Sequence, residues 1–159
     1  MDLKENHIKS NKKTIMRYLY LVTIFFLVLT GFGQMPVFKR YYIADIPGLG
    51  WLGQFFVTHY MHYLFAILLL GITAFIITGY FLANRKQIKI TPSGYIRGAV
   101  LFGLVITGVL LVIRNLAVSN FPSGLIIFLD ISHLTLVMVL LMAGLYCIIF
   151  KKKWYYRSR

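Results

Sequence analysis

Long apolar runs alternate with short polar stretches along this chain of 159 residues. An apolar helix needs about 20 residues to cross a hydrocarbon layer of about 30 Å. Four runs come close to that length or exceed it, and we place them at about residues 18–35, 52–83, 96–113 and 125–150. The pattern predicts an all-α transmembrane fold in a single integral membrane domain, residues 1–159.

Turn-forming residues separate the four predicted helices. The first connection contains Pro36 and Pro47, the second contains Thr91–Gly94, and the third contains Pro122. Proline and glycine at such positions end helices. Because the second and third breaks are short, consecutive helices should be antiparallel neighbours. We therefore predict an up-down-up-down four-helix bundle.

Composition supports a membrane protein. Hydrophobic residues make up 59% of the chain and charged residues only 13%, which is too apolar for an ordinary soluble domain. The net charge of +13 raises the question of nucleic acid. The basic residues, however, gather at the ends of the apolar runs and not on one face or among stacking aromatic residues. We expect no nucleic-acid partner.

The basic residues predict an orientation instead. Fourteen Lys and Arg residues fall in the two terminal tails and the second connection, against three on the opposite side, Lys39, Arg40 and Arg114. The positive-inside rule then places both termini in the cytoplasm. No small-residue cleavage pattern follows the first run, so we expect a retained helix and not a signal peptide. The expected location is the cytoplasmic membrane of a bacterium or archaeon.

Three of the four histidines lie in apolar sequence. His59 and His62 belong to the second run and His133 to the fourth, whereas His7 lies in the polar N-terminal tail. With the predicted topology all three lie at similar depth from the outer face, at 1.5 Å per helical residue. Ionisable residues inside a bilayer are rare without a function, and imidazole is a common haem-iron ligand. The pattern predicts a haem held between the second and fourth helices.

The second helix offers two histidines for one ligand position. His59 and His62 are three residues apart, about 4.5 Å along a helix, so at most one should bind iron. His62 is favoured because Ala66, one turn on, leaves room for a flat macrocycle, and His59 stays an alternative. The other histidine would bond a propionate, a quinone or a neighbouring helix. The structural alternative is that the histidines only make interhelical hydrogen bonds.

Other metals fit less well. A zinc or copper site would be expected to have carboxylate or thiolate ligands beside the imidazoles. The single cysteine, Cys147, lies in the cytoplasmic half of its helix, far from the predicted histidine level.

Two charged residues near the predicted outer face are further candidates. Asp130 precedes His133 by one helical turn and could accept a proton in quinol chemistry, or it could be a polar helix cap. Arg114 could pair with haem propionates, or it could anchor its helix among lipid headgroups. Five glycines should allow close helix contact: Gly31, Gly71, Gly79, Gly103 and Gly108.

The chain resembles the cytochrome b subunits of membrane oxidoreductases, such as formate dehydrogenase gamma and the b-type subunits of nickel-iron hydrogenase and thiosulfate reductase. The resemblance covers nearly the whole chain. It rests on four spans and on these residues: Arg17 before the first helix, Thr30-Gly31 and Pro36 at its exit, His59 and His62 in the second, and His133 in the fourth.

The resemblance implies two b haems, one near each membrane face. The ligands of the cytoplasmic haem would lie at 17–20 and 144–147, and neither stretch contains histidine. We therefore expect one haem b, near the periplasmic face. Electron exchange with quinone should then occur on that outer side.

These observations favour a cytochrome b membrane subunit of a redox complex, passing electrons between quinone and a partner subunit. The chain has no Cys-x-x-Cys-His motif and no cysteine cluster, so it is not expected to be catalytic alone. An iron–sulfur or multihaem cytochrome subunit is the expected partner. The alternatives are a haem-free membrane anchor and a small proton-coupled transporter.

Overall fold

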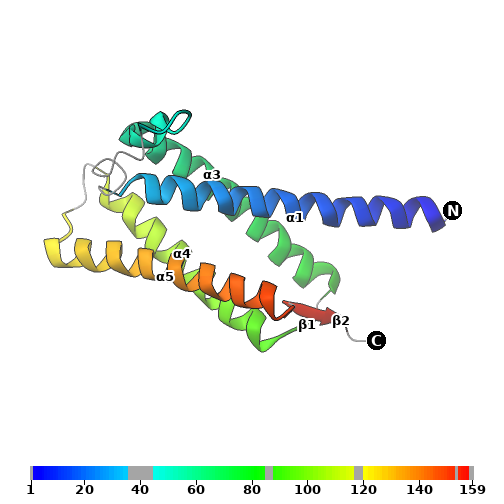
Figure 1. Cartoon of the computed structure of the whole chain (residues 1–159). Coiled ribbons are helices and arrows are strands. Elements are labelled where there is room, and N and C mark those ends of the chain that lie inside the picture. Colours follow the sequence, from blue (N-terminus) through cyan, green and yellow to red (C-terminus); the bar gives the residue numbers. More distant parts are fainter. Residues whose placement is uncertain (1, 36–44, 85–87, 117–119, 153, 158–159) are drawn as a thin grey trace. The chain divides into compact units, whose positions relative to one another are not determined.

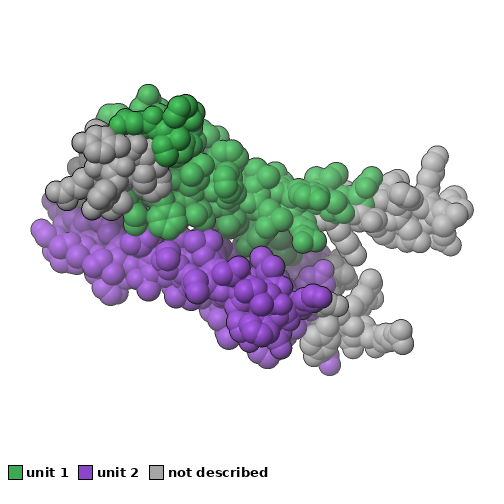
Figure 2. Space-filling view, in the orientation of Figure 1, with its two compact units in different colours: residues 1–78 green, residues 79–159 purple. Residues whose placement is uncertain are grey.

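The computed structural model describes residues 2–35, 45–84, 88–116, 120–152 and 154–157. It forms two compact units, residues 1–78 and 79–159, shown in different colours in Figure 2. Figure 1 labels the principal elements. Lys39, Arg40, Tyr41 and Tyr42 lie outside the described residues.

The first unit pairs two long antiparallel helices, α1 (Asp2–Gly33) and α3 (Phe55–Gly79). A short 3-10 helix, η2 (Gly50–Gly53), precedes α3, and its Leu52 is buried against the end of α1 at Gly33. The rings of Phe26 and Phe65 stack between the two helices with centroids 4.6 Å apart. The antiparallel register places the C-terminal end of α1 beside the N-terminal turns of α3.

The second unit pairs α4 (Pro92–Arg114) with α5 (Ser123–Ile149), also antiparallel. A single π-helical turn, η3 (Tyr80–Asn84), opens the unit. Helix α4 begins at Pro92 because the Thr91 hydroxyl accepts a hydrogen bond from the Gly94 backbone N–H. A threonine cap followed by proline is a favourable helix start.

A small β-ladder ties the C-terminal segment to the start of α4. Strand β1 (Ile88–Ile90) pairs antiparallel with β2 (Tyr155–Arg157). The Thr91 hydroxyl and backbone N–H both donate to the carbonyl oxygen of Trp154. A β-carbon on Gly94 would collide with that same oxygen, so only glycine fits there.

Arg97 is buried in this corner of the second unit, with 5% of its surface exposed. Its guanidinium donates to the carbonyl and hydroxyl oxygens of Ser93 and lies 4.1 Å from the centre of the Trp154 ring. The Ser93 hydroxyl also lies 3.2 Å from Cys147 Sγ on α5. The sequence pattern had placed Arg97 at the end of a connection, and the structure places it inside α4.

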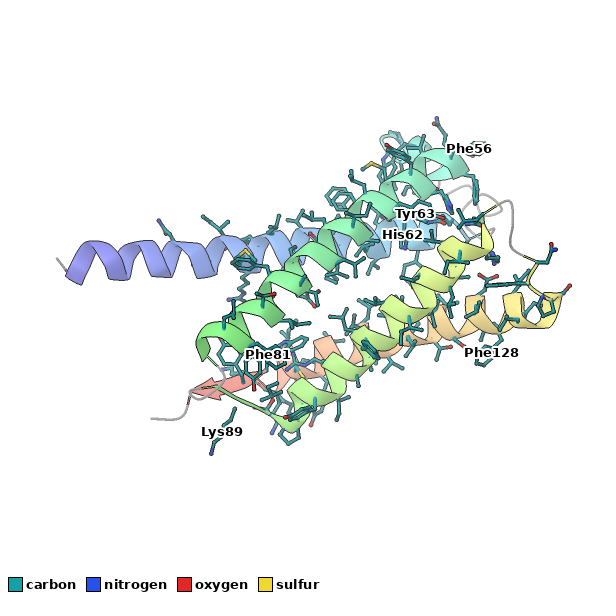
Figure 3. The ribbon with its side chains drawn as sticks, turned by 180° about the vertical axis from the view of Figure 1, so that it is seen from behind. Phe56, His62, Tyr63, Phe81, Lys89 and Phe128 are labelled. Carbon is teal, nitrogen blue, oxygen red and sulfur yellow. The ribbon has the colours of Figure 1, made fainter. Side chains whose placement is uncertain are left out.

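The predicted all-α transmembrane class is confirmed. Among the described residues, four helices are long and apolar enough to cross a membrane: Thr14–Gly33, Phe55–Leu82, Pro92–Arg114 and Ser123–Ile149. Most of their large apolar side chains are exposed, as a lipid-facing surface requires. Phe56 and Phe128, labelled in Figure 3, are 84% and 65% exposed. The chain is therefore a multi-pass membrane protein.

Helix bounds differ from the sequence prediction mainly at the N-terminal ends. Helix α1 begins at Asp2, although only its part from Thr14 is apolar enough to span. Helix α4 begins at Pro92 where Ile96 was expected. Hydropathy marks where a helix becomes apolar, whereas capping and propensity decide where it begins. The sidedness of the termini stays a prediction.

Candidate functional site

His62 lies about two turns into α3, on the side that contacts α1 (Figure 3). Its Nδ1 is 3.1 Å from the hydroxyl oxygen of Thr30 on α1. Thr30 is fully buried, and its hydroxyl also lies 2.6 Å from the carbonyl oxygen of Phe26. The imidazole is therefore anchored to the preceding helix through a threonine that is itself bonded to its own helix.

Gly31 makes room for this ring. A β-carbon there would lie 3.3 Å from His62 Cε1 and 3.6 Å from Nδ1. Any side chain at position 31 would press on the imidazole. We call His62, Thr30 and Gly31 the His62 cluster.

The second unit contains the same arrangement around His133 on α5. Its Nδ1 is 2.8 Å from the hydroxyl oxygen of Thr107 on α4. Thr107 also bonds the carbonyl oxygen of Gly103 at 2.9 Å, one turn back on its own helix. A β-carbon on Gly108 would lie 3.5 Å from His133 Cε1. We call His133, Thr107 and Gly108 the His133 cluster.

The two clusters contain the same three residue types in the same arrangement. In each unit a Thr-Gly dipeptide on the first helix faces a histidine on the following antiparallel helix. An imidazole whose Nδ1–H bonds an oxygen carries its lone pair on Nε2, the arrangement typical of metal-bound histidine. In each cluster Nδ1 of the imidazole lies at a hydroxyl oxygen of the preceding helix.

His59 has different surroundings. Its Nδ1 lies 3.0 Å from Gln34 Oε1, and the Gln34 amide nitrogen donates to the Thr30 carbonyl at 3.2 Å. Its ring contacts the aromatic rings of Phe55 and Tyr63 on the same helix, with centroid distances of 5.2 and 4.4 Å. The imidazole of His59 thus lies against a glutamine amide and two aromatic rings, whereas His62 lies against a threonine hydroxyl and a glycine.

Arg114 and Asp130 form an ion pair within the second unit. Arg114 Nη1 lies 3.0 and 2.9 Å from the two carboxylate oxygens of Asp130. Their side chains are 27% and 53% exposed. The two charged candidates of the sequence analysis are thus each other's partners, and the pair lies one helical turn from His133.

The five glycines behave differently from one another. Gly31, Gly103 and Gly108 each lie against a side chain of the neighbouring helix, Gly103 against Leu136. No atom lies within 4 Å of the β-carbon position of Gly71 or Gly79. Of these five glycines, Gly31 and Gly108 therefore pack beside a histidine, and Gly103 packs one turn from Thr107.

In the part of the chain that the structure describes, no group of three or more His, Cys, Asp or Glu side chains is placed to hold a metal ion. The imidazoles available are His59 and His62 in the first unit and His133 in the second. Haem needs only one or two axial ligands from the protein, since the porphyrin supplies the other four.

Sequence reasoning found the histidines and missed the role of their threonines. Thr30 entered only through a family resemblance and Thr107 was not singled out, whereas Gly31 and Gly108 were both named as glycines for helix packing. The available signal was the pairing of each intramembrane histidine with a Thr-Gly dipeptide in the preceding apolar run.

The chain has no match among protein-family models, curated proteins or solved structures. The resemblance to cytochrome b subunits therefore stays a hypothesis that rests on the residues themselves.

Proposed function

We propose that the chain is a b-type cytochrome subunit of a membrane redox complex, in which His62 and His133 are the two axial ligands of one haem b. The observation that carries the proposal is the occurrence of the same His–Thr–Gly arrangement in both units. Of the two histidines on α3, only His62 has the surroundings of His133. The repeat therefore favours His62 over His59 as the ligand.

The donor chemistry fits haem b. Neutral imidazoles with an anchored Nδ1–H offer Nε2 to iron. Cys147 is the single cysteine of the sequence, so the haem would be held without thioether bonds. Bound haem supplies one-electron transfer, and the protein supplies the ligands, their orientation and an apolar surrounding.

We further propose that the haem exchanges electrons with quinone and with a partner subunit. Quinone would be reduced, or quinol oxidised, on the outer side of the membrane, with Asp130 as the group that gives or takes the proton. Arg114 would hold that carboxylate in position through the ion pair. The electron partner would be an iron–sulfur or multihaem cytochrome subunit, because this chain offers no cysteine cluster of its own.

A haem-free membrane anchor is the second candidate, and the same hydrogen bonds favour it. A polar bond between membrane helices contributes about 0.6 kcal/mol on average. The two His–Thr bonds could serve packing alone. No observation on the described residues favours the third candidate, a small proton-coupled transporter.

Haem counting separates the candidates. The chain is expressed with haem synthesis active, purified in mild detergent, and measured by reduced-minus-oxidised spectra and pyridine haemochrome. We expect one haem b per chain. H62A and H133A should lose it, whereas H59A, the matched control one turn away on α3, should keep it. A colourless wild-type protein, or equal haem loss in H59A and H62A, would contradict the assignment.

The same preparation tests Asp130. D130N should retain haem, because Asp130 is not a ligand, and should slow haem reduction by a quinol analogue. An unchanged reduction rate in D130N would remove Asp130 from the proposal.

A further inference from the structure

We infer that Thr30 and Thr107 fix the tautomer of His62 and His133, so that Nδ1 holds the proton and Nε2 is the nitrogen presented to iron. The tautomer itself follows from the hydrogen bonds of each cluster. Only the final step, presentation to iron, rests on the proposed function.

The first step is to assign the hydroxyl proton. The Thr30 oxygen lies 2.6 Å from the Phe26 carbonyl oxygen, and the Thr107 oxygen lies 2.9 Å from the Gly103 carbonyl oxygen. A carbonyl oxygen is only an acceptor, so two oxygens this close must have a proton between them. That proton is the single hydroxyl hydrogen of each threonine.

The second step follows for the imidazole. With its proton directed to the carbonyl, each hydroxyl offers only a lone pair to the histidine. The contacts of 3.1 Å at His62 and 2.8 Å at His133 are then hydrogen bonds only if Nδ1 is protonated. A neutral imidazole with Nδ1–H has its lone pair on Nε2. The backbone of α1 and α4 thus determines which histidine nitrogen can coordinate.

The third step is geometric. Gly31 and Gly108 leave the imidazole edge in contact with the backbone side of the preceding helix. The Nδ1–Cε1 edge of each ring is therefore held against that helix. Threonine and glycine act together as positioning residues, the first by bonding and the second by leaving space.

Thr23 provides a matched control on α1. It is fully buried like Thr30, and its hydroxyl bonds the Leu19 carbonyl oxygen at 2.7 Å, also one turn back. This bond joins the hydroxyl to the backbone and not to an imidazole. T23V removes the same buried hydroxyl and the same intrahelical bond as T30V, without touching a histidine.

The test begins on haem-free protein. Histidine is labelled with ¹⁵N, and the ring nitrogens are assigned by NMR in nanodiscs. We expect both His62 and His133 to show a protonated Nδ1 and an unprotonated Nε2. T30V and T107V should lose this preference at His62 and His133 respectively, T30S and T107S should keep it, and T23V should leave both unchanged.

Haem titration gives the second readout. Losing a bond that orients a ligand typically weakens metal affinity by about 10–100-fold, and we expect this range for T30V and T107V but not for T23V. The midpoint potential should rise in both valine variants, because an imidazole without its Nδ1–H acceptor donates less charge to iron. The serine variants should restore affinity and potential together.

The outcomes distinguish this inference from the proposed function. Wild-type protein with a protonated Nε2 at either histidine overturns the tautomer assignment, whether or not haem binds. Valine variants that match T23V in both readouts overturn the positioning role while leaving haem binding intact. Wild-type protein that keeps the Nδ1–H tautomer and binds no haem rejects the iron step alone. Gel filtration and circular dichroism confirm that each variant is folded.

Discussion

The glycine of the preceding helix lies closer to His62 than to His133. A β-carbon at Gly31 would lie 3.3 Å from the His62 ring, closer than most real contacts, whereas at Gly108 it would lie at an ordinary 3.5 Å from His133. His62 has little freedom to move aside, because its Nδ1 is bonded to Thr30. The two clusters have the same arrangement, but the glycine lies closer to the imidazole in the His62 cluster than in the His133 cluster.

This difference predicts an order of sensitivity. G31A should displace the His62 ring and destabilise the protein by about 1 kcal/mol, the low end of the cost of overpacking. G108A should stay close to wild type. Thermal unfolding in nanodiscs measures the difference in stability between the two variants. A larger effect of G108A than of G31A would contradict the geometry described for the clusters.

At the scale of elements, the C-terminal strand depends on one close approach. Residue 94 lies directly against the Trp154 carbonyl, which accepts two hydrogen bonds from Thr91. Arg97 stacks on the Trp154 ring from the same helix. The start of α4 therefore holds strand β2 through a backbone contact, two hydrogen bonds and a cation–π contact.

G94A should release this strand, because its methyl group would occupy the place of the Trp154 carbonyl. G98A is the matched control on the same helix, since nothing lies within 4 Å of the β-carbon position of Gly98. We expect trypsin to cut near Lys151 and Lys152 several-fold faster in G94A than in wild type or G98A. Equal cleavage of the two variants would show that the strand is held by other contacts. Mass spectrometry of the released peptide gives the rate.

For the whole molecule, the open question is sidedness. The distribution of Lys and Arg predicts that both termini face the cytoplasm and that the connections before α3 and between α4 and α5 face outward. An even number of crossings is required for this result, and the four candidate helices satisfy it.

Reporter fusions test the orientation. Alkaline phosphatase, which is active only outside the cytoplasm, should be inactive when fused after residue 159 and active when fused after Asn120. A fluorescent protein that matures only in the cytoplasm should give the opposite pattern. Activity of the phosphatase at the C-terminus would reverse the predicted topology and would contradict the proposed position of quinone chemistry on the outer side.

The sequence by itself determined the membrane class, the number of long helices and the histidines worth testing. These follow from local hydropathy and from the rarity of imidazole in apolar runs, which are readable without knowing any contact. The same reading placed the start of α4 four residues late, because Thr91 and Pro92 act through capping and not through hydropathy.

The tertiary structure alone decided the partners. Thr30 and His62 are 32 residues apart in sequence, and Thr107 and His133 are 26 apart. Whether such residues meet depends on the register and rotation of packed helices, which a one-dimensional pattern does not encode. The same holds for the burial of Arg97 against Trp154 and for the pairing of Arg114 with Asp130. Apolar length specified the helices, and packing geometry specified which polar side chains became neighbours.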